Sequence, residues 1–333
     1  MKTIVKIEIA ILILVVLVAA GMILVSEGAL NLFYEPVVME RTPEPIPTEP
    51  AATEPIPQEP AQTQPAEETQ PEEEKRAITA SRYFAYDLQD DVYLEKQGDE
   101  DARLYPASIT KLLSSLVVLK YMDPRETVTV GDALLLVHEG SSVAELQEGD
   151  TLTVEQLISA MMLPSGNDAA QVAAVATGRA IGGKDLDYQT AAGIFSDEMN
   201  KQAKALGMKN SHFVSPDGYH DDNHYTTMND LVTLCEKVLT NETMLKYTSL
   251  DAFTVELPDR KLEWKNTNAL LHPSQETYLP ATIGLKTGFT SKAGNCLITA
   301  FFETDRVILI GVFGCPNKTP DRYLDTVDLY NSL

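Results

Sequence analysis

The chain has 333 residues, of which 44% are hydrophobic, so it is long enough for one large domain with appendages or for two domains. Its formal net charge of −23 argues against nucleic acid as a partner, because phosphate binding requires a basic patch. Three cysteines are too few for a disulfide framework or a cysteine-rich zinc site. We interpret Cys235, Cys296 and Cys315 as buried free thiols, although Cys296 and Cys315 could fall on adjacent strands.

Residues 1–30 predict a membrane anchor. The seventeen residues from Ile9 to Val25 carry no charge and are just long enough to span a bilayer of about 30 Å. Lys2 and Lys6 precede this run, which predicts that the N-terminus lies inside and the rest of the chain outside. Val18-Ala19-Ala20 would suit a signal-peptide cleavage site, which would make the protein secreted. The apolar run continues beyond that site, so we favour a retained anchor.

Residues 31–76 predict a disordered linker. Ten prolines lie between Pro36 and Pro71, mixed with Glu, Thr and Gln. Such a composition cannot bury enough apolar surface to offset the entropy of ordering. At about 3.1 Å per residue, an extended segment of this kind reaches on the order of 100 Å. We therefore expect it to hold the following domain away from the membrane.

Residues 77–333 predict a folded domain of the α/β class (α+β type), with strands at both ends and helices between them. A capping box at Thr153 and Gln156 and a C-cap glycine at Gly207 mark two of the helix ends. This order favours one antiparallel sheet with helices on both faces. The expected strands are 83–86, 92–94, 127–130, 281–286, 295–303 and 306–314, and the expected helices are 108–122, 154–162, 168–177, 195–206, one from 227 onward, and 320–330.

One helix start carries a pattern typical of nucleophilic catalysis. Ser108 is followed by Lys111 and then by an apolar run with helical spacing. Residues three apart lie on one face of a helix, so this spacing would set an amine beside the hydroxyl. A neutral serine is a weak nucleophile until a base takes its proton. Ser108 and Lys111 are therefore candidates for nucleophile and base.

Two further motifs make this pattern specific. Ser165-Gly166-Asn167 lies in an expected loop, and Lys286-Thr287-Gly288 ends an expected strand. Together with Ser108 and Lys111, and in this order, they resemble the active site of penicillin-binding proteins and serine β-lactamases. Further runs resemble the low-molecular-mass D-alanyl-D-alanine carboxypeptidases over roughly residues 77–333: Phe195–Asn200, Leu206–Met208, His212-Phe213, Pro216–Gly218, Thr226-Thr227, Asn266–Asn268 and Gly284–Thr290.

The resemblance implies the penicillin-binding protein/serine β-lactamase-like transpeptidase fold and a set of catalytic roles. Ser108 would attack the carbonyl between two D-alanines and form an acyl-enzyme. Lys111, with its pKa lowered by burial and nearby cations, would accept the serine proton. Ser165 would relay a proton to the leaving amine. Water would then hydrolyse the ester.

The same resemblance implies the substrate-binding residues. Asn167 would bind the peptide backbone of the substrate, and Lys286 with Thr287 and Thr290 would hold its terminal carboxylate. The backbone N–H groups of Ser108 and Phe289 would form an oxyanion hole, so the side chain of Phe289 should tolerate change. The substrate-binding set is therefore Asn167, Lys286, Thr287, Gly288, Phe289 and Thr290.

Together with the predicted anchor, these roles describe a membrane-anchored, extracytoplasmic enzyme. It would remove the terminal D-alanine from peptidoglycan stem pentapeptides, need no cofactor and be inhibited covalently by β-lactams. Carboxypeptidase, endopeptidase and weak transpeptidase activities are all compatible with the motifs. Two rival hypotheses are a serine β-lactamase and a non-catalytic cell-wall-binding scaffold on the same fold.

Two other features of the sequence receive a structural interpretation. His212, Asp217, His220 and His224 fall in one short stretch, and zinc uses such ligands, but we interpret them as solvated loop side chains rather than a metal site. Trp264 is the only tryptophan, and we expect it to pack in a strand-like segment rather than stack on sugar.

Overall fold

The computed structural model describes residues 76–303, 305–316 and 320–333. The predicted anchor and all of the predicted linker except Arg76 lie outside the described residues. Those from Ile78 to Leu333 belong to one compact unit. Among the described residues, none of the helices combines the length and the apolar character that a transmembrane segment needs.

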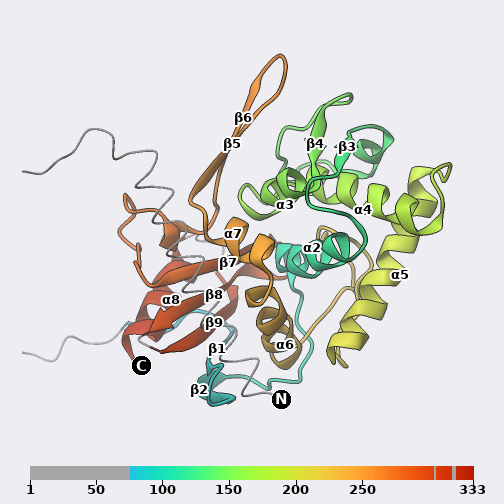
Figure 1. The fold of residues 1–333 in the computed structure, drawn as a ribbon. Helices are drawn as coiled ribbons and strands as arrows, with labels where there is room; N and C mark the ends of the chain where they lie inside the picture. Colours follow the sequence, from blue (N-terminus) through green and yellow to red (C-terminus); the bar gives the residue numbers. More distant parts are fainter. Residues whose placement is uncertain (1–75, 304, 317–319) are drawn as a thin grey trace, which may run out of the picture. The chain divides into compact units, whose positions relative to one another are not determined.

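A five-stranded antiparallel sheet organises this unit, with strand order β2-β1-β9-β8-β7 (Figure 1). The first and last strands of the described part of the chain therefore pair or lie next to each other within this sheet, since β1 pairs with both β2 and β9. The antiparallel sheet that the sequence predicted is confirmed. Its strands are β1 (Arg82–Asp87), β2 (Val92–Gln97), β7 (Thr282–Thr290), β8 (Gly294–Glu303) and β9 (Arg306–Cys315).

Both faces of the sheet are covered, as the sequence predicted. Along β8, Leu297 and Phe301 pack in a cluster with Tyr323 and Leu329 of α8 (Asp321–Asn331). Residues on the opposite face of β8, such as Ile298, join the larger core formed with the other helices. This alternation follows from the pleat of a strand, which sends successive side chains to opposite faces.

The remaining helices lie between the two parts of the sheet in the sequence. Thr153 and Gln156 form the predicted capping box of α3, and Gly207 ends α5 in the left-handed conformation. The helices are α2 (Thr110–Tyr121), α3 (Val154–Met162), α4 (Asn167–Gly182), α5 (Tyr188–Leu206), α6 (Met228–Leu239) and α7 (Glu242–Ser249), with short 3₁₀ helices η1 (Ala107–Ile109), η2 (Asp132–Leu136) and η3 (Ala269–Leu271).

Several predicted boundaries were wrong. Ser108 lies in η1, and the α-helix begins at Thr110 rather than at residue 108. Helix α4 starts at Asn167 and runs to Gly182, and α5 starts at Tyr188, seven residues before its predicted start, where the side chain of Asp187 caps it. Helix α7 was not predicted.

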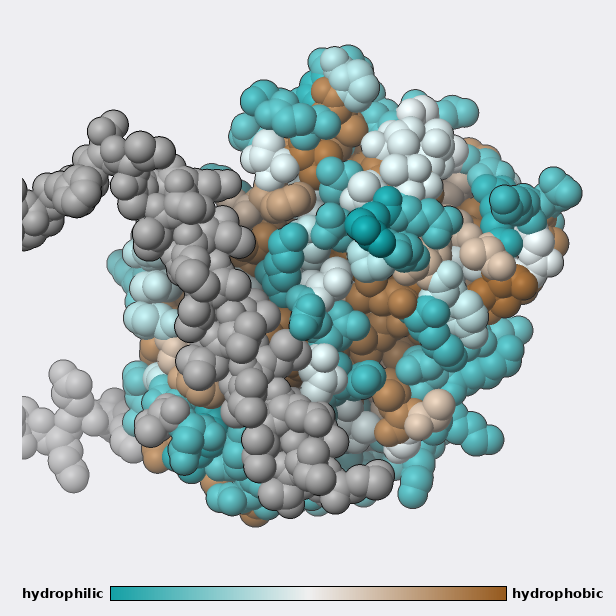
Figure 2. Space-filling model, in the orientation of Figure 1, coloured by the Kyte–Doolittle hydropathy of each residue, from teal (hydrophilic) through white to brown (hydrophobic). Residues whose placement is uncertain are grey.

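Two small sheets complete the fold. Strands β3 (Thr127–Thr129) and β4 (Thr151–Thr153) pair with each other, as do β5 (Ala252–Glu256) and β6 (Lys261–Lys265), which form a hairpin that projects beyond α3 (Figure 1). Hydrophilic residues make up most of the face drawn in Figure 2, and hydrophobic residues show there only in smaller patches. All three cysteines are buried and free, with Cys296 and Cys315 on the adjacent strands β8 and β9.

Candidate active site

Ser108 and Lys111 meet where η1 leads into α2. The Nζ atom of Lys111 donates a hydrogen bond to Ser108 Oγ over 2.8 Å, so the amine contacts the candidate nucleophile directly. Ala107, just before the serine, has a φ of +49°, which is uncommon for a residue with a side chain. Such a conformation persists only where the surroundings hold it in place. The predicted contact between hydroxyl and amine is thus present.

Lys111 is fully buried and is surrounded by neutral oxygen acceptors. Besides Ser108, its Nζ donates to Asn167 Oδ1 over 2.7 Å and to the carbonyl of Asp217 over 3.0 Å. Burial disfavours the charged form and lowers the pKa of Lys111 to about 8, although the negative charges of Asp217 and Asp168 oppose the shift. A lysine with a pKa near 8 has a substantial neutral fraction near neutral pH and can accept a proton.

The turn between α3 and α4 presents Ser165 and Asn167. Ser165 has a φ of +63°, and Asn167 is the first residue of α4. The backbone of this turn is held by Ser142, whose hydroxyl donates to the carbonyl of Ser165 over 2.8 Å and whose carbonyl accepts from the N–H of Asn167 over 2.8 Å. Asn167 therefore reaches Lys111 from a turn that is fixed on both sides.

The Lys286-Thr287-Gly288 motif lies within β7 and faces η1. The Nζ of buried Lys286 donates to the carbonyl of Thr287 over 3.2 Å, and Thr287 Oγ1 lies 2.6 Å from Thr267 Oγ1. Burial first, and then the nearby cations Lys111 and Arg322, lower the pKa of Lys286 well below its ordinary value.

Gly288 allows β7 to approach the nucleophile. A Cβ at this position would lie 2.9 Å from the carbonyl oxygen of Pro106 and 3.3 Å from the backbone nitrogen of Ser108. A glycine without a side chain is needed for so close an approach of two backbones. The strand therefore lies against the same backbone N–H that the sequence assigned to the oxyanion hole.

These elements enclose a cavity of about 710 Å³. Lys111 and Lys286 are buried and are not among the lining residues, whereas the side chain of Phe289 is 54% exposed. Of the predicted site residues, those that line the cavity are Ser108, Ser165, Asn167, Thr287, Gly288, Phe289 and Thr290. The structure thus brings together the residues of all three motifs.

Arg322 is a cavity residue that the sequence did not reveal. It lies in the first turn of α8 and is 7% exposed. Its Nη1 donates to the carbonyl of Gly288 over 3.3 Å, and its Nη2 donates to the hydroxyl of Tyr323 over 2.9 Å, while its buried Nε has no partner. The sequence around Arg322 does not indicate that this side chain reaches the cavity, because only tertiary packing brings α8 to β7.

The role of Asp217 was also missed. Its carbonyl accepts from Lys111, and its buried carboxylate accepts from Tyr219 N over 2.9 Å and from Gln171 Nε2 over 3.2 Å. Gly218, the next residue, has a φ of +78°, and a Cβ there would lie 1.9 Å from the carbonyl oxygen of Ala107. The Pro216–Gly218 run therefore supports both Ala107 and Lys111.

The interpretation of the stretch with three histidines as solvated loop side chains was wrong for Asp217 and His224, which are both buried. His224 is buried, its Nε2 lies 2.7 Å from Thr110 Oγ1, and burial lowers its pKa to about 4. His220 lies 3.5 Å from a carboxylate oxygen of Asp222, and His212 Nδ1 lies 2.6 Å from the carbonyl of Asn223. Across residues 76–303, 305–316 and 320–333, no three or more histidine, cysteine or carboxylate side chains are grouped in a way that would hold a metal ion.

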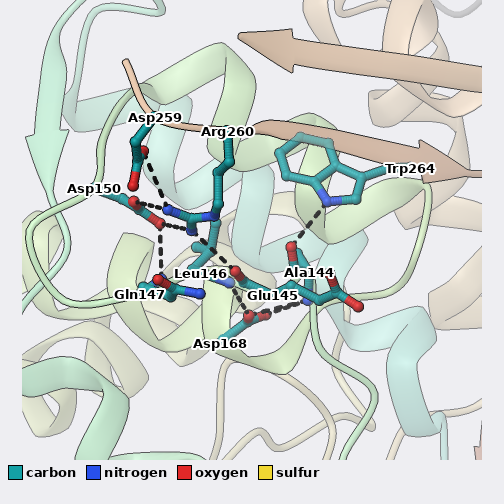
Figure 3. A network of polar contacts seen from close by, with 9 residues as sticks. All are labelled: Ala144, Glu145, Leu146, Gln147, Asp150, Asp168, Asp259, Arg260 and Trp264. Carbon is teal, nitrogen blue, oxygen red and sulfur yellow. Dashed lines mark hydrogen bonds and ion pairs between the residues drawn. The ribbon is translucent and has the colours of Figure 1, made fainter. Parts of the chain in front are cut away.

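Residues 139–142 of the loop 137–150 line the cavity. Two elements hold the later part of this loop (Figure 3). From α4, the carboxylate of Asp168 accepts from the N–H groups of Ala144 and Leu146 over 2.8–3.0 Å. From β6, Trp264 Nε1 donates to the carbonyl of Ala144 over 2.9 Å. Trp264 is 4% exposed, so its predicted packing role is confirmed, with a hydrogen bond that was not predicted.

The tip of the β5–β6 hairpin adds an ion pair to this loop (Figure 3). Arg260 forms two contacts with the carboxylate of Asp150, at 2.8 and 2.5 Å, and donates to the carbonyl of Glu145 over 3.2 Å. We call Asp168, Trp264, Arg260 and Asp150 the loop clamp. Because Ser142 of the clamped loop bonds to Ser165 and Asn167, the clamp is connected to the catalytic turn.

Comparison with known proteins gives consistent matches. The family model described as D-alanyl-D-alanine carboxypeptidase, Peptidase_S11, matches residues 67–317. The D-alanyl-D-alanine carboxypeptidase of Streptomyces sp. strain K15 is 32% identical over 69% of this chain and 79% of its own length. DacF of Bacillus subtilis is 29% identical, and DacA of Escherichia coli is 31% identical. The chain matches about half the length of these last two relatives, 54% and 56%.

Solved structures show the same fold. The Streptomyces K15 DD-transpeptidase superposes with a TM-score of 0.69 at 29% identity, covering 77% of this chain and 97% of that one. Penicillin-binding protein D2 from Listeria monocytogenes, in its cefotaxime-bound form, gives a TM-score of 0.62 at 29% identity, covering 79% of this chain and 98% of that one. These matches confirm the predicted fold and the predicted family resemblance.

Proposed function

The chain belongs to the D-alanyl-D-alanine carboxypeptidase family (Peptidase_S11), and we propose that it is a serine-type carboxypeptidase that removes the terminal D-alanine from peptidoglycan stem peptides. The observation that carries this proposal is the contact of 2.8 Å between Ser108 Oγ and a buried lysine whose pKa is about 8. A lysine poised in this way can act as a general base toward the serine hydroxyl.

The proposed acylation step starts from this contact. Ser108 Oγ attacks the carbonyl carbon between the two D-alanines while Lys111 takes its proton. The carbon–nitrogen bond then breaks, and the proton passes through Ser165 to the leaving amine of D-alanine. The backbone N–H groups of Ser108 and Phe289 stabilise the negative charge that develops on the carbonyl oxygen of the substrate. Each such donor typically lowers the barrier by a few kcal/mol. The product is an ester of the shortened peptide with Ser108.

Deacylation returns the enzyme to its starting state. Water attacks the ester carbon, and a proton of that water goes to Lys111, the base of the acylation step. The bond between the ester carbon and Ser108 Oγ then breaks as that oxygen is reprotonated. A β-lactam enters the same acylation step, but its leaving amine stays attached to the acyl group. Covalent inhibition by β-lactams is therefore part of the proposal.

The substrate's terminal carboxylate is proposed to bind at the β7 side of the cavity. Thr287, Thr290 and the guanidinium of Arg322 line the cavity there, and the amine of Lys286 lies buried behind it. An anion beside Lys286 would favour the charged form of the amine and raise its lowered pKa again. Arg322 thus joins the carboxylate-binding residues that the sequence had named.

The rival β-lactamase hypothesis would need a carboxylate that activates water. Glu198 was the superficial candidate for that role. It accepts from Lys120 Nζ over 2.9 Å and from the hydroxyl of Tyr121 over 2.7 Å, and it is not among the cavity-lining residues. This placement argues against Glu198 as the water-activating residue of a β-lactamase.

We further propose that residues 1–30 anchor the protein in the cell membrane and that residues 31–76 space the domain from it, with the catalytic unit extracytoplasmic. The support is the uncharged run from Ile9 to Val25, which the lysines Lys2 and Lys6 precede, and the proline-rich composition that follows.

The test is intact-mass spectrometry of the full-length protein after exposure to benzylpenicillin, with Ser108→Ala alongside, together with an assay of D-alanine release from a peptide ending in D-Ala-D-Ala. We expect a stable adduct on the wild-type protein, none on the variant, and release of D-alanine. Rapid loss of the adduct with consumption of penicillin would favour the β-lactamase reading. Absence of both adduct and release would favour a non-catalytic scaffold.

A further inference from the structure

The cavity contains one carboxylate that is open to solvent and unpaired. Among the lining residues, Glu139, Asp217, His220 and Arg322 have side chains that can carry charge. The carboxylate of Asp217 is buried, and its oxygens accept from Tyr219 and Gln171. Glu139 is exposed, and within the described part of the chain no ion pair or hydrogen bond engages its carboxylate. Its charge is therefore available to a ligand.

Glu139 lies on a segment that is held at both ends. On one side, the ring of His138 stacks on Tyr219, with centroids 3.9 Å apart and planes 20° from parallel. On the other side, Ser142 bonds to the backbone of Ser165 and Asn167, and the loop clamp fixes the residues that follow (Figure 3). A charge on such a segment is presented at a defined place, which is what specific recognition requires.

The cavity therefore has opposite charges on different walls. Arg322 lies against β7, where the terminal carboxylate is proposed to bind, and Glu139 lies on the loop that is tied to α4. A volume of about 710 Å³ is within the usual range for sites that enclose whole ligands, roughly 300–1,000 Å³, so it has room for more than the two D-alanines.

We propose that Glu139 is a specificity-determining residue that pairs with an ammonium group of the stem peptide, such as the side-chain amine of a diamino acid residue that precedes D-Ala-D-Ala. This inference rests on the proposed carboxypeptidase function. It names the substrate class of the same site: a peptide with a carboxylate at its end and a free amine on a nearby side chain.

The test compares two peptides that differ only in that amine: Nα-acetyl-L-Lys-D-Ala-D-Ala and its Nα,Nε-diacetyl form. An exposed ion pair is typically worth about 0.2–1 kcal/mol, so we expect the full-length wild-type protein to prefer the free amine by up to about fivefold in kcat/KM. Glu139→Gln should remove this preference by losing activity on the free-amine peptide alone. The wild-type preference should shrink as salt is added, because salt screens exposed charges.

Glu148→Gln is the matched control, because Glu148 is an exposed glutamate of the same loop that does not line the cavity. This variant should keep the wild-type preference. Both variants should be acylated by benzylpenicillin at the wild-type rate, since that compound has no ammonium group to pair.

An unchanged preference in Glu139→Gln would overturn the inference, and so would an equal loss of activity on both peptides. Hydrolysis of both peptides by the wild-type protein without any preference would overturn the inference and leave the proposed function standing. If the wild-type protein hydrolyses neither peptide, the proposed function fails and the inference fails with it.

Discussion

Lys111 sets the pH dependence that the site should have. Its three acceptors are all neutral oxygens, and burial brings its pKa to about 8. Only the neutral amine can accept the serine proton. At pH values below the pKa, the fraction of neutral amine rises about tenfold for each unit by which the pH increases. We therefore expect the rate of acylation by benzylpenicillin to rise with pH and to level off above about pH 8, measured by mass spectrometry at short reaction times.

Lys111→Arg provides the contrast, because its guanidinium stays protonated. Benzylpenicillin should acylate this variant at least about 100-fold more slowly than the wild-type protein at every pH, in line with the usual contribution of a positioned base. A wild-type rate that is independent of pH between about 6 and 9 would argue against Lys111 as the base.

Asp168 connects the loop clamp to this titration. Its buried carboxylate accepts from Ala144, Leu146 and Ala169, and its charge raises the pKa of Lys111. Asp168→Asn should lower the free energy of unfolding by about 1–3 kcal/mol, because buried N–H groups lose a charged acceptor. The same change should lower the pKa of Lys111, so that the rise in acylation rate moves to lower pH.

Urea denaturation and the pH profile of acylation measure these two effects separately. Ser142→Ala is the control, because it removes a neutral hydrogen bond from the same loop without changing its charge. Its pH profile should keep the wild-type midpoint. A midpoint that moves to higher pH in Asp168→Asn would contradict the electrostatic argument.

Two glycines test the packing of elements. A Cβ at Gly178 of α4 would lie 2.0 Å from the carbonyl oxygen of Ala191 in α5, whereas a Cβ at Gly193 of α5 would meet nothing within 4 Å. Gly178→Ala should therefore destabilise the protein by about 1–3 kcal/mol, since two helix backbones must separate. Gly193→Ala should stabilise it by up to about 1 kcal/mol, because alanine favours the helix. Thermal denaturation would rank them, and equal midpoints would contradict this account of the α4–α5 contact.

The β5–β6 hairpin should act on catalysis from a distance. Arg260→Ala removes its two contacts with Asp150 and its bond to the carbonyl of Glu145. We expect slower acylation and a changed emission of Trp264, the only tryptophan, since its environment includes the same loop. Arg260→Lys should restore part of the rate. Lys261→Ala, which breaks an exposed pair with Glu256 on the same hairpin, should leave rate and emission unchanged.

The elements were predictable where the signal is local. Short apolar or aromatic runs located β1, β8 and β9, and side-chain caps located α3. The start of α5 was missed because its first turn is polar and Gly193 interrupts the pattern, although Asp187 caps it. Short α7 has only eight residues, too few for a clear helical period.

The sequence predicted the motifs of the site but not the residues that hold those motifs in place. Ser108, Ser165 and Lys286 stand in recognisable short patterns. Arg322 and the loop clamp reach the site only through contacts between distant parts of the chain, as in the bond from Arg322 to Gly288, 34 residues away. Such contacts depend on how the elements pack, which no short pattern encodes.

At the scale of the whole molecule, our proposals place catalysis and tethering in different parts of the chain. Every residue placed in the site lies between Ser108 and Arg322, inside the unit that includes Ile78–Leu333. Deletion of residues 1–75 should therefore leave the rate of acylation within about twofold of wild type, as expected for a unit with its own core.

The same deletion should change where the protein is found. The full-length protein should stay with the membrane through salt and alkaline washes and be released by detergent, because an inserted apolar helix is not held by charge. The shortened protein should need no detergent. Recovery of the full-length product in the soluble fraction, with a new N-terminus after Ala20, would instead show that the segment is a cleaved signal peptide and that the domain works untethered.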